Sequence, residues 1–301
     1  MAEIIRPMTE ADLPQVAEID GTAFTELLTR LRNRPIHLPS HEIEYFKSWM
    51  ECDPEGSLVL EDRGKILGFN FCHARGRMGW VGPIAVRLGA QGRGIGKKLM
   101  AAGLDYFDHV GTKTVGLDTF PENPVSVSLY LRTGFRVVGG LFLLTRDMPP
   151  KKAHVVRVAQ IKPNEVNRIA EVDEKASGFD RRRDYEMALS SGLGCAYKVV
   201  AAEDNFVFGL IRRGGALIGN FHLTDGDKVE ERVAALVEGT LDFFRTKGIR
   251  GVGVLCRGSD KRLLDALFGL GFRMNPPMIT MHRGDDAPPT PLTSPLAIEK
   301  G

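Results

Sequence analysis

Residues 84–100 join an apolar run, three closely spaced glycines and the start of an amphipathic helix. The stretch reads IAVRLGAQGRGIGKKLM, and three of its four glycines occupy every second position from Gly92 to Gly96. Because glycine has no side chain, backbone N–H groups in such a turn can converge on one point. A helix beginning there adds unpaired N–H groups and the positive end of its dipole. The turn is therefore suited to binding a diphosphate. The cations beside it are Arg93, Lys97 and Lys98.

The spacing of these glycines excludes two familiar phosphate loops. The dinucleotide fingerprint G-x-G-x-x-G requires a longer interval before its last glycine. The P-loop requires a glycine five residues before Gly96 and Ser or Thr after Lys97, where the chain has Gln91 and Lys98. For the glycines alone, a tight turn without a ligand is the alternative interpretation.

Two motifs together carry a family resemblance. Gln91–Gly96 fits the pattern Q-x-x-G-x-G, and about thirty residues later Asn123–Phe135 reads NPVSVSLYLRTGF. They resemble the acyl-CoA pyrophosphate loop and the N-x-x-[AS]-x-x-[LF]-Y-x-x-x-G-F helix of the GNAT N-acetyltransferase superfamily. The resemblance covers residues 1 to about 148, roughly half of the chain.

The resemblance implies direct transfer of an acetyl group from acetyl-CoA, as co-substrate, to a primary amine. Tyr130 is expected to be the general acid that protonates the departing thiolate. The expected cofactor-binding residues are Ile84, Ala85 and Val86 at the pantetheine and thioester, Gln91, Gly92, Arg93, Gly94, Ile95, Gly96 and Lys97 at the diphosphate, and Asn123 and Ser126 beside the pantetheine.

The motifs assign no general base. Some family members carry a glutamate about four residues before the pantetheine-binding triplet, where this chain has Trp80. His73, Asp118 and a chain of waters stay open as alternatives. The absence of this glutamate also favours a second hypothesis, in which the chain is a non-catalytic module that binds or senses acyl-CoA.

Apolar periodicity predicts the elements that position these residues. Strands are expected at residues 4–7, 57–61, 66–73, 80–87 and 114–120, with two β segments at 136–139 and 141–146. Helices are expected after Thr9, from about Ser40, after the glycine turn and from Asn123. Residues 24–39 are expected to be irregular or partly helical and, by the resemblance, to contribute to the acceptor site.

The second half of the chain repeats the first in order. Ala170–Asp173 echoes Ala17–Asp20, and Gly271–Arg273 echoes Gly134–Arg136. Two further pairs are Gly68 with Gly209 and Val81-Gly82 with Ile218-Gly219. A collinear series of this kind indicates an internal duplication.

We therefore predict an α/β (α+β) fold of two tandem GNAT-like domains, each a mixed, mostly antiparallel sheet flanked by helices. The predicted parts are a catalytic acetyltransferase domain at 1–148, a linker at 149–153, a degenerate GNAT-like domain at 154–283 and a mobile proline-rich tail at 284–301.

The second copy departs from the motifs where the chemistry would lie. Thr224–Lys228 replaces the glycine turn and carries two carboxylates, which would repel a diphosphate. Asp260 stands for Asn123, and Leu267 stands for Tyr130. We predict no acetyl-CoA in this copy.

The composition limits the kinds of partner and the location that the sequence predicts. A net charge of +2 over 301 residues is too mild to favour nucleic acid or an anionic membrane. Four scattered cysteines without a C-x-x-C pair indicate neither a disulfide framework nor a metal site. No apolar block suggests a signal peptide or a membrane span, so a cytoplasmic location is expected. A small-molecule amine is the expected acceptor, with a protein amino group as the alternative. The sequence determines neither the acceptor's identity, nor the oligomeric state, nor the role of the second domain.

Overall fold

The computed structural model describes residues 3–212, 215–224 and 226–284, and within them the chain forms two compact units. The first unit contains the chain up to residue 137 together with residues 281–284, and the second contains residues 138–280. Apart from residue 284, the predicted proline-rich tail lies outside the described residues.

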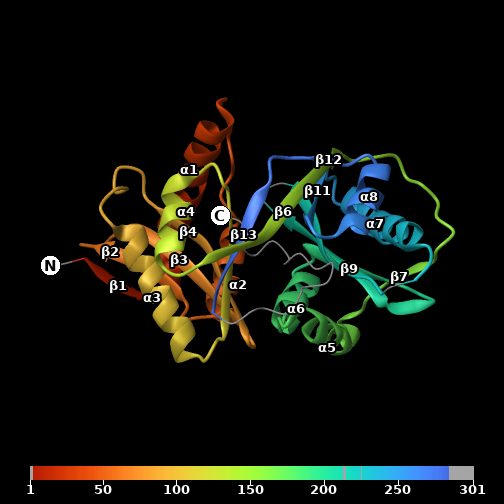
Figure 1. The fold of residues 1–301 in the computed structure, drawn as a ribbon, viewed down its shortest axis with the longest axis horizontal. Coiled ribbons are helices and arrows are strands. Elements are labelled where there is room, and N and C mark those ends of the chain that lie inside the picture. Colours follow the sequence, from red (N-terminus) through yellow and green to blue (C-terminus); the bar gives the residue numbers. More distant parts are fainter. Residues whose placement is uncertain (1–2, 213–214, 225, 285–301) are drawn as a thin grey trace. The chain divides into compact units, whose positions relative to one another are not determined.

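The first unit is a mixed sheet with helices packed against it (Figure 1). Its strands follow the order β1-β2-β3-β4-β5, with the end of β13 beside β5. Neighbours from β1 to β4 are antiparallel, whereas β4 and β5 are parallel. The strands are β1 (Ile4–Pro7), β2 (Ser57–Asp62), β3 (Lys65–Arg75), β4 (Met78–Val86), β5 (Thr114–Thr119) and β13 (Met278–Gly284). The helices are η1 (Glu10–Asp12), α1 (Leu13–Arg32), α2 (Ile43–Cys52), α3 (Ile95–His109) and α4 (Pro124–Arg132).

Helix α1 is longer than its apolar stripe alone indicates. Residues 24–39, expected to be irregular or partly helical, are helical as far as Arg32. Buried residues recur at helical spacing as far as Phe24, and after Pro14 in the first turn no proline follows before Pro35. Asn33 caps the helix after its last residue, Arg32, in a left-handed conformation with φ 48°.

Helix α3 is anchored by its apolar face. Ile95 and Leu99 pack in one buried cluster with Leu58, Leu60 and Leu67 of β2 and β3. This packing fixes the helix over the sheet, and so it fixes the position of the helix's N-terminal end beside β4.

The second unit repeats the first element for element. Its strands pair in the order β6-β11-β10-β9-β8-β7, and only β10 and β11 are parallel among the pairs β7 to β11. The predicted duplication and fold class are therefore confirmed. The strands are β6 (Arg136–Asp147), β7 (Val158–Gln160), β8 (Gly194–Val199), β9 (Ala202–Arg212), β10 (Gly215–His222), β11 (Gly251–Arg257) and β12 (Arg273–Met274). The helices are η2 (Pro163–Glu165), α5 (Val166–Ser177), α6 (Arg182–Ser190), α7 (Val229–Thr246) and α8 (Lys261–Gly269).

Strand β6 differs from its prediction. It is one continuous strand, not two β segments, and residues 141–147 pair with β11. Because these residues pair with β11, most of β6 belongs to the second unit, which begins at residue 138. The sequence predicts a domain boundary after residue 148.

The sheet registers also correct the alignment of the two copies. The parallel pairing ends at Trp80 in β4 and at Ile218 in β10. Trp80 therefore corresponds to Ile218, and Gly82 corresponds to Asn220, one residue away from the predicted match. Both Gly82 and Asn220 have positive φ angles, 133° and 50°. Gly209 lies opposite Ile218 as His73 lies opposite Trp80, so Gly209 is not the counterpart of Gly68.

Among the helices of the described residues, none combines the length and the apolar character that crossing a membrane requires. All four cysteines are free thiols, and Cys72, Cys195 and Cys256 are buried.

Candidate active site

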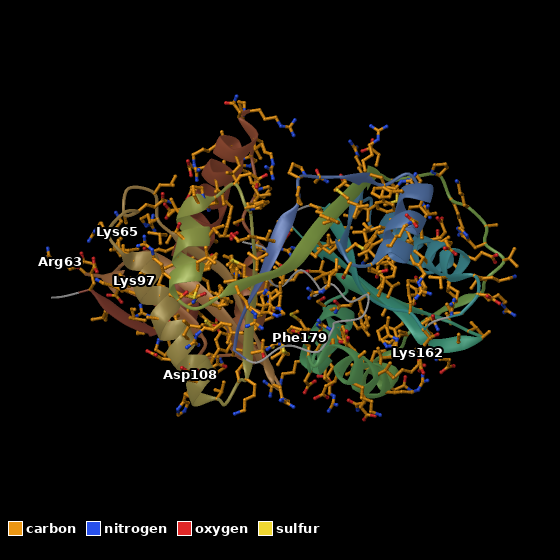
Figure 2. The ribbon with its side chains drawn as sticks, in the orientation of Figure 1. Arg63, Lys65, Lys97, Asp108, Lys162 and Phe179 are labelled. Atoms are coloured by element: carbon orange, nitrogen blue, oxygen red, sulfur yellow. The ribbon has the colours of Figure 1, made fainter. Side chains whose placement is uncertain are left out.

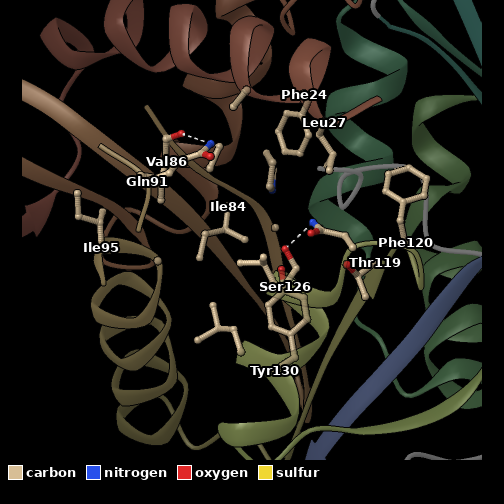
Figure 3. Close-up of a pocket in the computed structure, with 18 of the residues that line it drawn as sticks. Phe24, Leu27, Ile84, Val86, Gln91, Ile95, Thr119, Phe120, Ser126 and Tyr130 are labelled. Atoms are coloured by element: carbon tan, nitrogen blue, oxygen red, sulfur yellow. Dashed lines mark hydrogen bonds between the residues drawn. The ribbon is translucent and has the colours of Figure 1, made fainter. Parts of the chain in front are cut away.

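The two parallel strands of the first unit separate and border a cavity. Their register covers only Met78–Trp80 of β4 against Thr114–Gly116 of β5. Beyond that point, residues 81–86 of β4 and residues 117–119 of β5 line a cavity of about 380 Å³ (Figure 3). Strands that no longer pair with each other leave backbone N–H and C=O groups directed at the space between them. Ile84, Ala85 and Val86 all lie on this wall.

A β-bulge marks the place where β4 leaves β5. Cys72 of β3 pairs with Val81, and Asn70 pairs with Ile84, so two steps on β3 oppose three on β4. The extra residue falls at Gly82-Pro83, where Gly82 has a φ of 133° that side chains rarely adopt. Bulges of this kind redirect a strand and are frequent beside active sites.

The glycine turn forms one end of the cavity. Gly92 and Gly94 have φ angles of 79° and 78°, in the left-handed region that glycine adopts readily. Gly94 is the N-cap of α3, and the N–H of Lys98 donates to its carbonyl at 3.1 Å. The N–H groups of residues 95–97 precede that bond, so they are available to a ligand. The side-chain amide of Gln91 donates to the Val86 carbonyl at 3.3 Å and ties the turn to β4 (Figure 3).

The three cations after the turn differ in their surroundings. Lys97 lines the cavity and projects from α3 (Figure 2). Arg93 and Lys98 instead contact the carboxylate of Glu3, each at 2.7 Å. The hydrogen bond from Lys98 and the charges of both cations lower the pKa of Glu3. Arg93 is thus the one predicted site residue that does not border the cavity.

The second motif closes the cavity from α4. The Asn123 side-chain amide donates to the Ser126 hydroxyl at 2.8 Å, and both residues line the cavity (Figure 3). Tyr130 follows one turn later and is 7% exposed. Burial raises the pKa of Tyr130 to about 12, and a hydrogen bond with Ser126 offsets this only in part. The phenol therefore stays protonated at neutral pH and can act as a donor.

The structure separates the two candidate bases. His73 is 1% exposed, and it does not line the cavity. Its Nε2 lies 3.1 Å from the Gly82 carbonyl, and its Nδ1 lies 3.3 Å from Asp53. Because both nitrogens contact Gly82 and Asp53 behind the cavity, neither nitrogen of His73 faces a substrate there. Asp118 does border the cavity. Trp80 is fully buried, and its ring lies so close to Gly116 that a Cβ there would approach it to 2.4 Å.

Helix α1 contributes residues that the sequence analysis placed in an expected acceptor region without naming them singly. Phe24 and Leu27 face the cavity (Figure 3), and Glu26 and Arg30 also line it, with 3.3 Å between their side chains. The members of each pair are three or four residues apart, a spacing that places them on the same face of a helix. This spacing is the signal by which the sequence could have indicated that the helix continues past Phe24. Thr119 and Phe120 at the end of β5 complete this part of the wall.

The corresponding places in the second unit are built differently. Asp260 caps α8 by accepting a hydrogen bond from the Leu263 N–H at 3.1 Å, and Leu267 is fully buried. At the start of α7, Arg232 donates to the Thr224 carbonyl at 3.2 Å. The first turn of α7 carries two glutamates, which would repel a phosphate. They are Glu230 and Glu231.

Comparison with known proteins agrees with this architecture. Residues 21–135 match the model of the acetyltransferase (GNAT) family. The chain is 35% identical over 152 residues to a protein named mycothiol acetyltransferase from Streptomyces coelicolor, a match that covers 45% of this chain and 49% of that protein. Matches to the curated relatives span between 28% and 49% of their lengths, at most about half.

Two solved structures share the fold over nearly the whole chain. A putative acetyltransferase from Pyrococcus horikoshii has a TM-score of 0.75 at 22% identity, covering 99% of this chain and 96% of that one. A tandem GNAT protein from the clavulanic acid biosynthesis pathway has a TM-score of 0.65 at 14% identity, with 94% and 98% covered. At these identities, the likeness to the two structures shows the fold alone. Residues 21–135, the segment that matches the model of the acetyltransferase (GNAT) family, contain both the glycine turn and the Asn123–Tyr130 helix.

Proposed function

We propose that this protein transfers the acetyl group of acetyl-CoA to a primary amine by direct attack, in the cavity of the first unit. The observation that carries the proposal is the convergence of three features on one cavity. These are the separated strands β4 and β5, the glycine turn with the N-terminus of α3, and Tyr130.

The residues present suit the parts of acetyl-CoA. The diphosphate would accept hydrogen bonds from the N–H groups between Gly92 and Lys97, assisted by the Lys97 charge. The pantetheine would lie along Ile84–Val86, whose backbone groups can pair with its amides as a strand would. Asn123 and Ser126 would line the same arm from α4.

The reaction forms a bond between the amine nitrogen and the acetyl carbon and breaks the bond between that carbon and sulfur. The amine loses a proton to Asp118 or to water, and the sulfur gains one from Tyr130. Donors from the backbone of β4 would stabilise the negative charge that develops on the thioester oxygen.

The high pKa of Tyr130 restricts its role. A pKa of about 12 lies ~3.5 units above that of a free thiol, so transfer to a solvated thiolate would cost about 5 kcal/mol. The thiolate, however, leaves inside the same buried cavity. Burial raises the pKa of a thiol as well, as it does for the buried Cys72. We therefore place the proton transfer at the moment when the carbon–sulfur bond breaks, before the thiolate reaches solvent.

We further propose that only the first unit binds the cofactor. Glu230 and Glu231 at the start of α7, and the replacement of Tyr130 by Leu267, support this assignment. The acceptor is proposed to be a small-molecule amine. The relatives named mycothiol acetyltransferase support a small acceptor, and the carboxylates of Glu26 and Asp118 in the cavity wall would attract a cationic amine.

A screen for CoA release tests the proposal. Acetyl-CoA is incubated with panels of small amines, amino acids, aminoglycosides and peptides, and free thiol is measured against a control without amine. We expect release with at least one class of small amine. Saturable acetyl-CoA binding without release on any class would instead support a non-catalytic acyl-CoA module.

A further inference from the structure

His73 connects the hydrophobic core to the bulge in β4. Its Nε2 lies 3.1 Å from the Gly82 carbonyl oxygen, and because a carbonyl only accepts, Nε2 carries the proton and donates. Gly82 lines the cavity, whereas His73 lies behind it on β3. The imidazole thus contacts the rear of the wall along which we place the pantetheine.

Asp53 holds the other side of the ring. Its carboxylate lies 3.3 Å from His73 Nδ1 and accepts from the Ala74 N–H at 3.0 Å, Arg75 at 2.7 Å and the Tyr106 hydroxyl at 3.1 Å. Burial alone would raise the pKa of Asp53, but the hydrogen bond with His73 and the charge of Arg75 lower it to about 2. The carboxylate is therefore ionised throughout the neutral range.

Aromatic packing leaves the ring of His73 little freedom. It stacks on Phe71 with 6.2 Å between ring centroids and meets Trp49 edge-on at 5.8 Å. Hydrogen bonds at both nitrogens and packing on the ring define a single orientation. The donor to Gly82 is consequently fixed.

The Gly82 carbonyl needs such a donor. A bulge disrupts the regular ladder, and a buried carbonyl without a partner costs about 1–3 kcal/mol. We propose that His73 is a positioning residue that fixes the β4 bulge through Gly82 and thereby sets the direction of Ile84–Val86 toward the thioester. This inference rests on the acetyltransferase function proposed above, and it reassigns His73 from candidate base to support of the strand.

The second unit holds its own bulge in a comparable way with different residues. Asn220, the counterpart of Gly82, donates from its side chain to the Tyr185 hydroxyl at 3.1 Å. That hydroxyl donates to the buried Asp173 at 2.6 Å. The position of His73 is occupied there by Gly209, which has no side chain to offer. In both units a buried aspartate is therefore linked to the bulge through one ring-bearing side chain.

Two substitutions separate positioning from packing. The amide nitrogen of glutamine falls near the place of imidazole Nε2, so His73→Gln keeps a donor to Gly82. The amide nitrogen of asparagine corresponds to Nδ1, so His73→Asn keeps a partner for Asp53 and loses Gly82. Both variants remove the ring from the aromatic cluster, and we expect similar losses of thermal stability.

The full-length variants are compared by turnover, by acetyl-CoA affinity and by hydrogen exchange of residues 81–86. We expect His73→Asn to lower kcat by about 10- to 100-fold, because small displacements of a reacting group have effects of that size. Its Kd for acetyl-CoA should change less than about threefold, since the diphosphate contacts are untouched. Exchange in residues 81–86 should become faster. His73→Gln should recover most of the turnover and the slow exchange.

Equal loss of turnover in both variants, with unchanged exchange in residues 81–86, would overturn the inference. Such an equal loss is what a proton acceptor at position 73 would give, because neither the glutamine amide nor the asparagine amide can take up a proton. The exchange measurement needs no turnover, so it tests the role of His73 even if the wild-type protein acetylates no amine. A wild-type protein that acetylates no amine would contradict only the proposed function and would leave the role of His73 to be decided by the exchange measurement.

Discussion

Replacing Gly96 by alanine should strengthen the fold and weaken cofactor binding. Gly96 lies in the first turn of α3 and lines the cavity. Unlike Gly92 and Gly94, it has no positive φ angle, so alanine fits its backbone without strain. A Cβ built there would meet Leu129 and Val86 side chains at 3.8 Å, which is ordinary contact. Both of those side chains line the cavity, so the added methyl group enters the space proposed for the diphosphate arm.

The two expected effects have opposite signs. Alanine is favoured over glycine in a helix by roughly 0.5–1 kcal/mol, with the lower figure expected near an end. A rise in Tm of about 1–4 °C follows for a chain of this size. Obstructing one or two charge-assisted hydrogen bonds, each worth about 1.5–3 kcal/mol, should raise the Kd for acetyl-CoA by about 10- to 100-fold.

Thermal unfolding and isothermal titration measure the two effects on the same sample. Gly269→Ala is the matched control, because Gly269 also lies at a helix end with open space around its Cβ position, but in the second unit. It should raise Tm without changing acetyl-CoA affinity. The reasoning is refuted if Gly96→Ala gains stability and keeps full affinity, because the amides at the start of α3 would then not contact the diphosphate.

Further substitutions test the other parts of the site. Tyr130→Phe should lower kcat by about 100-fold, the scale of general acid catalysis, with little change in Kd; unaltered turnover would remove Tyr130 from the acid role. Lys97→Ala should weaken acetyl-CoA binding about tenfold, as loss of one charge-assisted contact predicts, whereas Arg93→Ala should cost less than about threefold because Glu3 already holds Arg93. An equal effect of both changes would contradict this distinction. Asp53→Asn should destabilise the protein at pH 7 by about 2 kcal/mol, the equivalent of lowering a pKa from 3.8 to about 2. Because the folded-state pKa is depressed, this stabilisation is present above about pH 4 and is lost as the pH falls toward 2. The free energies of unfolding of the variant and the wild type should therefore converge as the pH falls from about 4 to 2. A difference that stays constant with pH would refute the proposed contribution of the ionised Asp53.

The meeting of the two motifs at one cavity could be predicted because each motif is contiguous in the sequence. The glycine turn and the Asn123–Tyr130 helix each carry their spacing within a few residues, and the structure brings both to one cavity. The duplication could be predicted for a similar reason, because the order of elements survives even where individual residues diverge.

What the sequence did not reveal depends on contacts between distant segments. Leu27 and Arg30 of α1 line the cavity only because the helix continues past its buried half. The pairing of β6 with β11 joins strands separated by more than a hundred residues along the chain. The engagement of both nitrogens of His73 depends on Asp53 and on a backbone carbonyl across the hairpin, and no local pattern encodes either partner. The one-residue error in aligning Gly82 arose because the match of Trp80 with Ile218 is fixed by the pairing of β4 with β5 and of β10 with β11, which no local pattern encodes.

Titration of the full-length chain with acetyl-CoA tests most directly whether backbone amides of the first unit alone hold the cofactor. We predict a single site per chain, with an affinity that Gly96→Ala reduces. Two equivalent sites, or a single site that the substitution leaves unaffected, would contradict the account.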